Sequence, residues 1–401
     1  MRTASALLFL FSLLATAQEP IVLSPVAGDN APALRAALDV LRKQKGGVLV
    51  LNPGTYSVGA QLSLDNLADA HILGRGEAIL KLLPERHTRT TKAAKTGETE
   101  ILVQQADVFV PGLAIELQGA IRNTLTPEGK PHRISHITTT IKEVQADRLV
   151  LARPLTADVP AGAPVVHPMN LFDGRRNIRN LTIQNLTLDL NRDAWPVRPF
   201  NHARNSGIFL HGPYSYETGP TGPALEGVRI IDCTIKNSHH RGIAFYNVRN
   251  SGVYHCRIEN TAAEGIDFDH FVTHCQAVGN TLVNCRNIEL NDASDCLVSD
   301  NLLRTCRTGI VVWQWCQLPG LNERNLILRN RFEDCPPPAI SLRKGADQNT
   351  VRNNSGHLAK GPAIVIDGKG NLFGENPFQV DQGDVQRIAP GNLLAQPAED
   401  E

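Results

Sequence analysis

A short alternating pattern recurs through the second half of the chain and limits the possible fold more than any other feature. In each copy the second and fourth residues are apolar while the third and fifth vary, which is typical of a strand with one buried face. From residue 242 onward the copies begin 22 to 30 residues apart. The seven copies are residues 207–211, 242–246, 265–269, 287–291, 309–313, 339–343 and 363–367.

A second short strand precedes these segments along the chain. Residues 232–237, 300–305 and 329–334 align without gaps, and residues 279–284 fit the same frame. One coil of about 20 to 30 residues cannot bury its own apolar face, so successive coils must stack and pair their strands in parallel. A leucine-rich horseshoe is the alternative repeat fold, but the sequence lacks its leucine spacing and helical segment. The repeat therefore predicts an all-β chain wound into a single-stranded parallel β-helix.

The segments around the repeat divide the chain further. Arg2, the apolar run 6–14 and the small residues at 15 and 17 predict a secretory signal peptide over residues 1–17. Residues 18–98 are expected to hold an N-terminal cap and the first coils, and residues 169–385 the later coils. Between them the coil rhythm stops, so residues 99–168 are expected to form a small inserted β subdomain, acting as a structural cap or in substrate binding. Residues 386–401 are expected to be a flexible C-terminal tail.

The N-terminal part of the mature chain carries a family resemblance. Asn30 is placed to cap a helix over residues 31–45, and Gly46 and Gly47 are placed to end it before a strand at 48–51. This helix has an apolar stripe of Leu34, Ala37, Leu38 and Leu41. The passage from residue 28 to residue 56 resembles the N-terminal cap of the pectin-lyase-like superfamily. The resemblance implies a right-handed parallel β-helix with an N-terminal capping helix.

All eight cysteines lie between Cys233 and Cys335, and their spacing follows the repeat. Cys285, Cys306 and Cys335 share one position of the coil, and Cys233 and Cys256 share another that Asn280, Asn301 and Asn330 continue. Cysteine in such a column behaves as a small buried apolar residue, whereas stacked asparagines bond along the ladder. We therefore favour free thiols over disulfides, and over metal ligation, because no close pair of cysteines is present.

The alternation also predicts which side chains leave the core. One outward column reads Phe209, Ala244, Asp267, Glu289, Val311 and Ser341, and the other reads His211, Tyr246, Asp269, Asn291, Trp313 and Arg343. The acidic residues fall on two neighbouring strands, with His270 directly after Asp269. Carboxylates held this close cannot all ionise easily, and a protonated acid beside an ionised one is what glycosidic bond cleavage requires.

These residues define the candidate site. We assign catalytic roles to Asp267, Asp269, Glu289 and His270. The expected substrate-binding residues are His211, His240, Arg241, Tyr246, Asn291, Trp313, Arg343 and Lys344. Tyr246 and Trp313 are spaced as sugar-stacking platforms, and Arg343 and Lys344 suit a uronate carboxylate. No cofactor is firmly expected, although the oxygen atoms of Asp267, Asp269, Glu289 and Asn291 are also suitable ligands for Ca²⁺.

Two enzyme families resemble this part of the chain. Residues 264–269 resemble the Asp-Gly-Ile-Asp-Pro-Asp region of polygalacturonases, and residues 340–344 resemble the Arg-Ile-Lys element of that family. The paired aspartates of that family align with Cys285 and Arg286, so Glu289 would supply the further carboxylate. Residues 265–270 more loosely resemble the Asp-Pro-His-Asp/Glu strand of mannuronan C5-epimerases, which implies a base among His211, His240 and His270.

Charge and composition limit the kinds of partner that the chain is expected to bind. Forty acidic and forty basic residues cancel, and no basic run interleaved with aromatics predicts a nucleic-acid partner. No later stretch reaches the roughly 18 apolar residues of a membrane helix. We predict a secreted or periplasmic monomer that binds a polysaccharide. Its function is expected to be that of a glycoside hydrolase, alternatively of a polysaccharide lyase or C5-epimerase acting on a uronate polymer, or of a non-catalytic glycan-binding protein.

Overall fold

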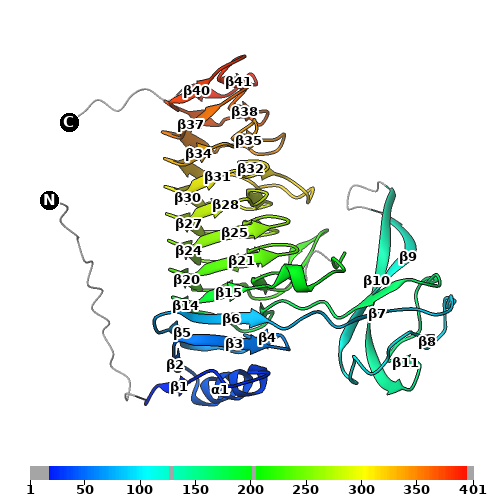
Figure 1. Cartoon of the computed structure of the whole chain (residues 1–401). Coiled ribbons are helices and arrows are strands. Elements are labelled where there is room, and N and C mark those ends of the chain that lie inside the picture. The colour runs from blue at the N-terminus through cyan, green and yellow to red at the C-terminus, as the bar shows by residue number, and fades with distance from the viewer. Residues whose placement is uncertain (1–17, 126–130, 201–204, 395–401) are drawn as a thin grey trace.

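The chain forms an upright trunk of stacked coils with a small β subdomain standing to one side (Figure 1). The computed structural model describes residues 18–125, 131–200 and 205–394. The predicted signal peptide lies outside these ranges. In the part of the chain that is described, no helix is long and apolar enough to cross a membrane.

Each coil of the trunk contributes to three parallel sheets, and the coils wind as a right-handed parallel β-helix. The first sheet contains β1 Ile21–Leu23, β2 Gly47–Leu51, β5 Ala68–Gly74, β14 Arg179–Gln184, β19 Leu225–Glu226, β20 Arg229–Ile231, β23 Val248–Arg249, β24 Gly252–Tyr254, β27 Gln276–Val278, β30 Leu297–Ser299, β33 Leu326–Leu328, β36 Thr350–Arg352, β39 Leu372–Phe373 and β42 Leu393–Leu394. The repeat did not reveal these strands, most of which are only two or three residues long.

The second sheet holds the strands predicted to precede the repeated segments. Its members are β3 Gly54–Val58, β6 Ala78–Leu82, β15 Thr187–Asp189, β21 Thr234–Ser238, β25 Arg257–Thr261, β28 Thr281–Val283, β31 Leu302–Arg304, β34 Arg331–Glu333, β37 Ser355–Leu358 and β40 Phe378–Val380.

The third sheet is built from the repeated segments themselves, and it carries the candidate site. It contains β4 Leu62–Ser63, β13 Phe172–Gly174, β16 Ile208–His211, β22 Ile243–Tyr246, β26 Ile266–Asp269, β29 Ile288–Asn291, β32 Ile310–Trp313, β35 Ile340–Leu342, β38 Ile364–Ile366 and β41 Gln386–Ile388. The parallel β-helix that the repeat predicts is therefore confirmed.

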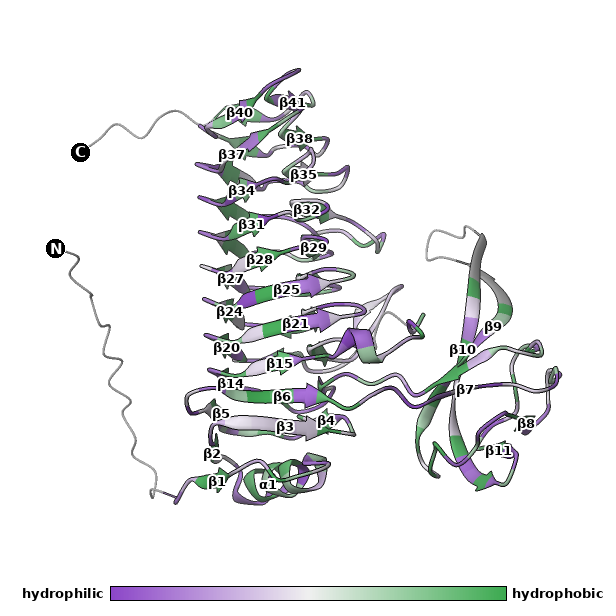
Figure 2. Cartoon of the chain, in the orientation of Figure 1, coloured by the Kyte–Doolittle hydropathy of each residue, from purple (hydrophilic) through white to green (hydrophobic). Residues whose placement is uncertain are grey.

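The N-terminal helix α1, Ala31–Gln44, closes the lower end of the trunk in the view of Figure 1. Its predicted apolar stripe is buried, and the helix ends with Lys45 in the left-handed conformation at φ 58°. One apolar core then runs from this helix through the coils up to Phe378 and Ile388. In Figure 2 the trunk strands carry both apolar and polar residues, as strands with one buried face should, and several of the turns between them are polar.

Stacked asparagines satisfy the buried polar backbone at two corners. Asn280, Asn301 and Asn330 form one ladder, in which the side-chain amide of Asn301 donates to the Oδ1 of Asn330 (2.9 Å) and to the carbonyl oxygen of Ala277 (2.8 Å). The predicted column of Asn280, Asn301 and Asn330 is thus confirmed. The ladders pair polar groups that would be costly to bury alone.

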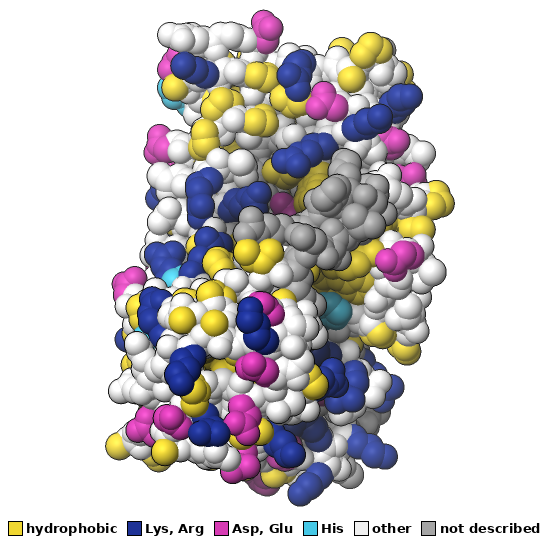
Figure 3. Space-filling model, turned by 90° about the vertical axis from the view of Figure 1, so that its right-hand side faces the viewer, with side chains coloured by type: hydrophobic (Ala, Val, Ile, Leu, Met, Phe, Trp, Pro, Cys, Tyr) yellow, Lys and Arg dark blue, Asp and Glu magenta, His cyan; other side chains and the backbone are white. Residues whose placement is uncertain are grey.

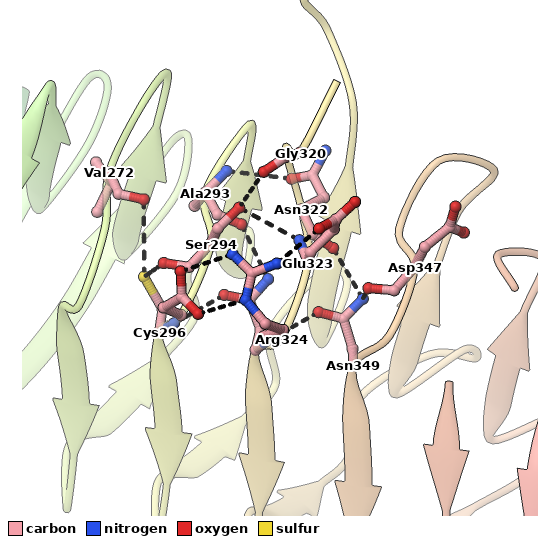
Figure 4. A network of polar contacts seen from close by, with 12 residues as sticks. Val272, Ala293, Ser294, Cys296, Gly320, Asn322, Glu323, Arg324, Asp347 and Asn349 are labelled. Carbon is pink, nitrogen blue, oxygen red and sulfur yellow. Dashed lines mark hydrogen bonds and ion pairs between the residues drawn. The ribbon is translucent and has the colours of Figure 1, made fainter. Parts of the chain in front are cut away.

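The second ladder and a column cysteine are drawn in Figure 4. The amide of Asn349 donates to the carbonyl oxygens of Asn322 (2.9 Å) and Asp347 (3.0 Å). The thiol of Cys296 donates to the carbonyl oxygen of Ser294 at 3.3 Å. All eight cysteines are free and buried in the structure.

The inserted subdomain is an antiparallel six-stranded sheet with a core of its own. Its strands, in spatial order, are β7 His87–Arg89, β12 Pro164–Val166, β9 Ala114–Leu125, β10 Pro131–Gln145, β11 Arg148–Leu151 and β8 Glu100–Leu102. The subdomain therefore begins at β7, before the predicted boundary at residue 99. This short polar strand shows no alternation that could have marked it.

The predicted tail also needs correction. Residues 386–388 and 393–394 are strands β41 and β42, which pair in parallel with β38 and β39 of the preceding coil. Their sequence is too polar and short to predict strands. Backbone bonds to the coil below, such as Leu393 N–H to the carbonyl oxygen of Asn371 (2.9 Å), are enough to hold them. The remaining short elements are the β17 Tyr214–Ser215 and β18 Gly219–Pro220 hairpin and the 3₁₀ turn Arg192–Ala194.

Candidate functional site

The third sheet aligns the outward side chains as the repeat predicts. Phe209 pairs with Ala244, Ala244 with Asp267, Asp267 with Glu289, and Glu289 with Val311. In the other column His211 pairs with Tyr246, Tyr246 with Asp269, and Asn291 with Trp313. Asp267 and Glu289 are therefore direct neighbours on β26 and β29, and Asp269 lies two residues from Asp267 on the same face.

This outward face is nevertheless covered, which the alternation cannot reveal. Asp267 is 0% exposed, Asp269 4% and Glu289 7%, so Glu289 is the most accessible of the three carboxyl groups. Tyr214, from the loop after β16, packs against Tyr246 with ring centroids 6.2 Å apart. Figure 3 faces this side of the molecule and shows Lys and Arg side chains at several places on its surface.

Arg241 lies at the centre of the acidic cluster. Its guanidinium pairs with the carboxylate of Asp267 and lies 3.1 Å from that of Glu264, which Arg286 contacts in turn at 2.9 Å. The phenol of Tyr246 donates to Asp267 Oδ2 at 3.3 Å. Burial raises the pKa of Asp267, while Arg241 opposes that rise and the charges of Asp269, Glu264 and Glu289 add to it. The arginine thus ties together two carboxylates that would otherwise repel each other.

Glu289 has the protonation behaviour expected of a proton donor. Burial, together with the charges of Glu264 and Asp269, raises its pKa to about 7. Hydrogen bonds from the side chains of Trp313 and Asn287 oppose this rise, and the Asn287 amide donates to Glu289 Oε2 at 3.2 Å. At neutral pH a substantial fraction of this carboxyl group is therefore protonated.

An aromatic cluster borders the acids on the side of the earlier coils. His211 stacks on Tyr246 with ring centroids 5.4 Å apart and lies 5.0 Å from Tyr214. Burial and the charge of Arg175 lower the pKa of His211 to about 4, so its imidazole is neutral at physiological pH. Tyr214 was missed in the sequence because it lies in a long loop between coils, where no repeat marks its position.

The aromatic and basic groups on the other side of the acids are more accessible. Trp313 is partly exposed, and the guanidinium carbon of Arg343 lies 5.6 Å from the centre of its indole ring. Lys344 follows Arg343 and is also exposed. Trp315 packs edge-on against Trp313, with ring centroids 5.7 Å apart. These groups form a partly open platform beside Glu289.

Four predicted substrate-binding residues are buried instead, namely His240, Arg241, Tyr246 and Asn291. His240 is 1% exposed, and its Nε2 lies 2.6 Å from the carbonyl oxygen of Pro199. Arg241 is 7% exposed and engaged with the acids. The side chain of Asn291 is also buried at 3% exposure. These positions suit side chains that support the site, and the assignment of substrate-binding roles to them stays a prediction.

His270 lies beside residues that were not singled out in the sequence. Its Nδ1 is 2.8 Å from Asp292 Oδ2 and 3.1 Å from Asp269 Oδ1. The thiol of Cys316 lies 4.0 Å from the same nitrogen. Asp292 and Cys316 follow outward strands rather than lying on them, so the alternation could not find them. A signal did exist, since Cys316 falls outside the cysteine columns.

The residues around His270 and the acidic residues Asp267, Asp269 and Glu289 differ in whether their ligand atoms lie close enough to share a metal ion. Among the residues that the structure describes, His270, Asp292 and Cys316 bring ligand atoms within 4.8 Å of one another, and Asp267, Asp269 and Glu289 do not form such a group. The expectation of a Ca²⁺ ion at the oxygen-bearing residues stays a prediction.

Comparison with known proteins supports the fold. Residues 215–356 match the NosD family, which is described as a periplasmic copper-binding protein. A solved glycoside hydrolase is 11% identical with a TM-score of 0.51, and the likeness covers 94% of this chain and 96% of that one. The A-module of the Azotobacter vinelandii mannuronan C-5 epimerase AlgE4 is 13% identical with a TM-score of 0.36, over 93% and 98% of the two chains.

A tailspike mutant of the E. coli bacteriophage HK620 is 10% identical, with a TM-score of 0.43, over 93% of this chain and 64% of that one. No significant match is found among curated proteins. The chain has a right-handed parallel β-helix, the fold that its likeness to the solved glycoside hydrolase supports. At these identities the likeness specifies the fold alone, so any argument about function depends on the site.

Proposed function

We propose that this protein is a carbohydrate-active enzyme that hydrolyses glycosidic bonds of a polysaccharide, with Glu289 as the general acid. The observation that carries the proposal is the raised pKa of Glu289 at the edge of a carboxylate cluster. A glycosidase needs one carboxyl group that is protonated at working pH and a second carboxylate close to it.

The second carboxylate comes from β26, where the paired guanidinium of Arg241 favours ionised Asp267 against the burial that raises its pKa. Asp267 is the register neighbour of Glu289, and parallel side chains on adjacent strands are about 4.8 Å apart at their backbones. Register neighbours on adjacent strands can bring their carboxyl groups to the roughly 5 Å separation that retaining glycosidases use. Asp269 on the same face is the alternative partner. Substrate entry requires the cover over Asp267 to open, because this carboxylate is fully buried.

The partly open platform gives the substrate a place to bind. Trp313 offers an aromatic face for a sugar ring, and Arg343 and Lys344 supply positive charge beside it. A polysaccharide with uronate residues would use both features. We therefore place the binding subsites along the third sheet, from β29 toward β35.

A second reaction is favoured by one specific observation. The imidazole of His211 is kept neutral and stacks on Tyr246, whose phenol contacts Asp267. A neutral imidazole beside phenols can accept or relay a proton, as β-elimination or C5-epimerisation of a uronate requires. Its low pKa makes His211 a weak base, so hydrolysis is the first proposal and this lyase or epimerase reaction the second.

A polysaccharide panel separates these reactions. The full-length mature protein is incubated with neutral and uronate-containing polymers while reducing ends and the ultraviolet absorbance of unsaturated uronates are measured together. The proposal expects new reducing ends without the absorbance. Growth of the absorbance contradicts hydrolysis and supports the lyase. A changed uronate composition without cleavage supports the epimerase, and binding without any change supports the non-catalytic glycan-binding alternative.

A further inference from the structure

Cys316 differs from the other cysteines of the chain. The other seven lie in inward columns, where their thiols contact backbone carbonyl oxygens, as Cys275 contacts Thr273 (3.5 Å) and Cys335 contacts Leu303 (3.5 Å). Cys316 follows β32, and its thiol lies 4.0 Å from His270 Nδ1. The column cysteines act as small buried apolar residues, and that role therefore does not account for Cys316.

Asp292 is a buried carboxylate with an unusual set of partners. It is 0% exposed, and among the described residues its side-chain ion pair is with His270 alone. The backbone N–H groups of Trp315 and Cys316 donate to it at 2.9 and 3.0 Å. Asp267 and Glu264, by contrast, have arginines beside them. A buried carboxylate without a fixed cation is costly unless a positive charge joins it.

We propose that His270, Asp292 and Cys316 form a binding site for a thiophilic divalent transition-metal ion such as Zn²⁺. The ligand atoms lie within 4.8 Å of one another and come from three successive coils. A tetrahedral Zn²⁺ with bonds of about 2.0 to 2.3 Å would place its ligand atoms roughly 3.3 to 3.6 Å apart. The contacts of 2.8 Å to Asp292 and 4.0 Å to Cys316 need only small side-chain movements to reach this range.

The charges and protons also balance. A thiolate and a carboxylate carry two negative charges, which a divalent ion neutralises with a neutral imidazole as third ligand. On binding, the Cys316 thiol releases its proton to solvent. The imidazole of His270 binds the ion through Nδ1 and carries its own proton on Nε2. Nitrogen, oxygen and sulfur donors together favour Zn²⁺ over Ca²⁺ and Mg²⁺, which prefer oxygen alone.

The surroundings already hold the ligands in place. The rings of Tyr214 and Tyr216 pack on the His270 ring, with centroids 5.3 and 4.9 Å from it. The two backbone N–H groups fix Asp292, as outer-shell donors do at many metal sites. This site would make His270 a metal ligand in place of the catalytic residue predicted from the sequence. It does not depend on the proposed hydrolase, which uses Glu289 and Asp267.

Cobalt substitution tests the site directly. The full mature protein is stripped with a chelator and titrated with Co²⁺, whose bond to a thiolate gives a charge-transfer band in the near ultraviolet. The proposal expects one equivalent of Co²⁺, a thiolate band, and displacement of Co²⁺ by Zn²⁺. The Cys316→Ser variant should lose the band and bind at least tenfold more weakly, whereas Cys296→Ser, a matched column cysteine, should retain both.

Asp292→Asn provides a second variant in case Cys316→Ser fails to fold, and far-ultraviolet circular dichroism checks the fold of each protein. This variant should retain the thiolate band with at least tenfold weaker binding. The absence of a thiolate band in the parent overturns the proposal and leaves His270 and Asp292 as an ordinary ion pair. A band that persists in Cys316→Ser, or disappears in Cys296→Ser, overturns it equally. The outcome of the polysaccharide panel does not affect the interpretation of these metal-binding measurements.

Discussion

Two sets of buried polar residues lie a few ångströms from the same apolar core, and they differ in how well they are satisfied. In the asparagine ladders, side-chain amides bond to neighbouring coils, as Asn301 does to Asn330 of the next coil and to Ala277 of the preceding one. In the acidic cluster, carboxylates crowd around Arg241, and Asp267 Oδ1 is buried without a hydrogen-bond partner. The ladders stabilise the coil, whereas the cluster keeps charges in a place where they cost stability.

This difference indicates which positions of a regular scaffold are candidates for function. A polar group that completes the backbone of the repeat needs no further explanation. A group that is buried at a cost, with a pKa displaced by its neighbours, is a candidate for chemistry.

Removing the proposed acid should affect activity most. On the substrate found in the polysaccharide panel, Glu289→Gln should lower kcat/KM about 100- to 10,000-fold, because an amide cannot donate the required proton. The parent should also lose activity as pH rises through about 7, since Glu289 is protonated only below that value. Glu259→Gln, on the second sheet, is the matched control and should keep full activity. Equal activity in both variants would remove Glu289 from the mechanism.

A change in the ladder should have the opposite profile, with a loss of stability and little direct effect on chemistry. Asn301→Ala removes bonds to Asn330, Ala277 and Asn280 and leaves their buried polar groups unpaired. We expect a loss of about 2 to 4 kcal/mol in the free energy of unfolding. Urea denaturation measures it, with the exposed Gln317→Ala as a control within about 0.5 kcal/mol of the parent. A loss of less than about 1 kcal/mol would mean that the ladder does not support the coil.

A third region shows whether the cost of buried carboxylates extends beyond the site. Glu85, at the root of the inserted subdomain, has its pKa raised to about 8 by burial, against a hydrogen bond from Val197 N–H and with the charge of Glu116 adding to the rise. A carboxyl group whose pKa is raised to about 8 by folding makes the folded protein less stable as pH rises from about 4.5 to about 8. The free energy of unfolding should therefore fall less across this pH window in Glu85→Gln than in the parent, by about 1 to 4 kcal/mol.

Thermal unfolding at several pH values checks the Glu85 prediction. Glu98→Gln, at an exposed position, should leave the pH profile of the parent unchanged. An unaltered profile in Glu85→Gln would show that this carboxyl group does not set the pH dependence of stability.

The smallest effect is expected at the platform. Arg343→Ala removes a guanidinium from the face of Trp313 and should raise KM for a uronate polymer about fivefold, which corresponds to about 1 kcal/mol. The value of kcat should change little, because Arg343 follows β35, two strands from Glu289 in the third sheet. Arg331→Ala, on the second sheet, is the control. A fall in kcat with constant KM would place Arg343 in the chemistry instead.

The sequence could predict the columns but not what covers them. Strict alternation placed Asp267 beside Glu289 because parallel coils keep their register. Tyr214 lies in a loop of unequal length, and Asp292 adopts the left-handed conformation at φ 54° directly after a strand, so neither follows the repeat. The burial of His240 and Arg241 likewise depends on contacts between distant loops. The sequence alone could have singled out Cys316, because its spacing places it outside the cysteine columns.

We infer that the acids of the third sheet are present for chemistry and that they cost the fold stability. Urea denaturation of the parent and of Glu289→Gln at pH 5 and pH 8 tests this inference most directly. Because the pKa of Glu289 is raised from 4.5 to about 7 in the folded state, the charge penalty is small at pH 5 and much larger at pH 8. We predict a difference in unfolding free energy below about 1 kcal/mol at pH 5 and a variant about 1 to 3 kcal/mol more stable than the parent at pH 8. A variant less stable than the parent at pH 8 would contradict the account.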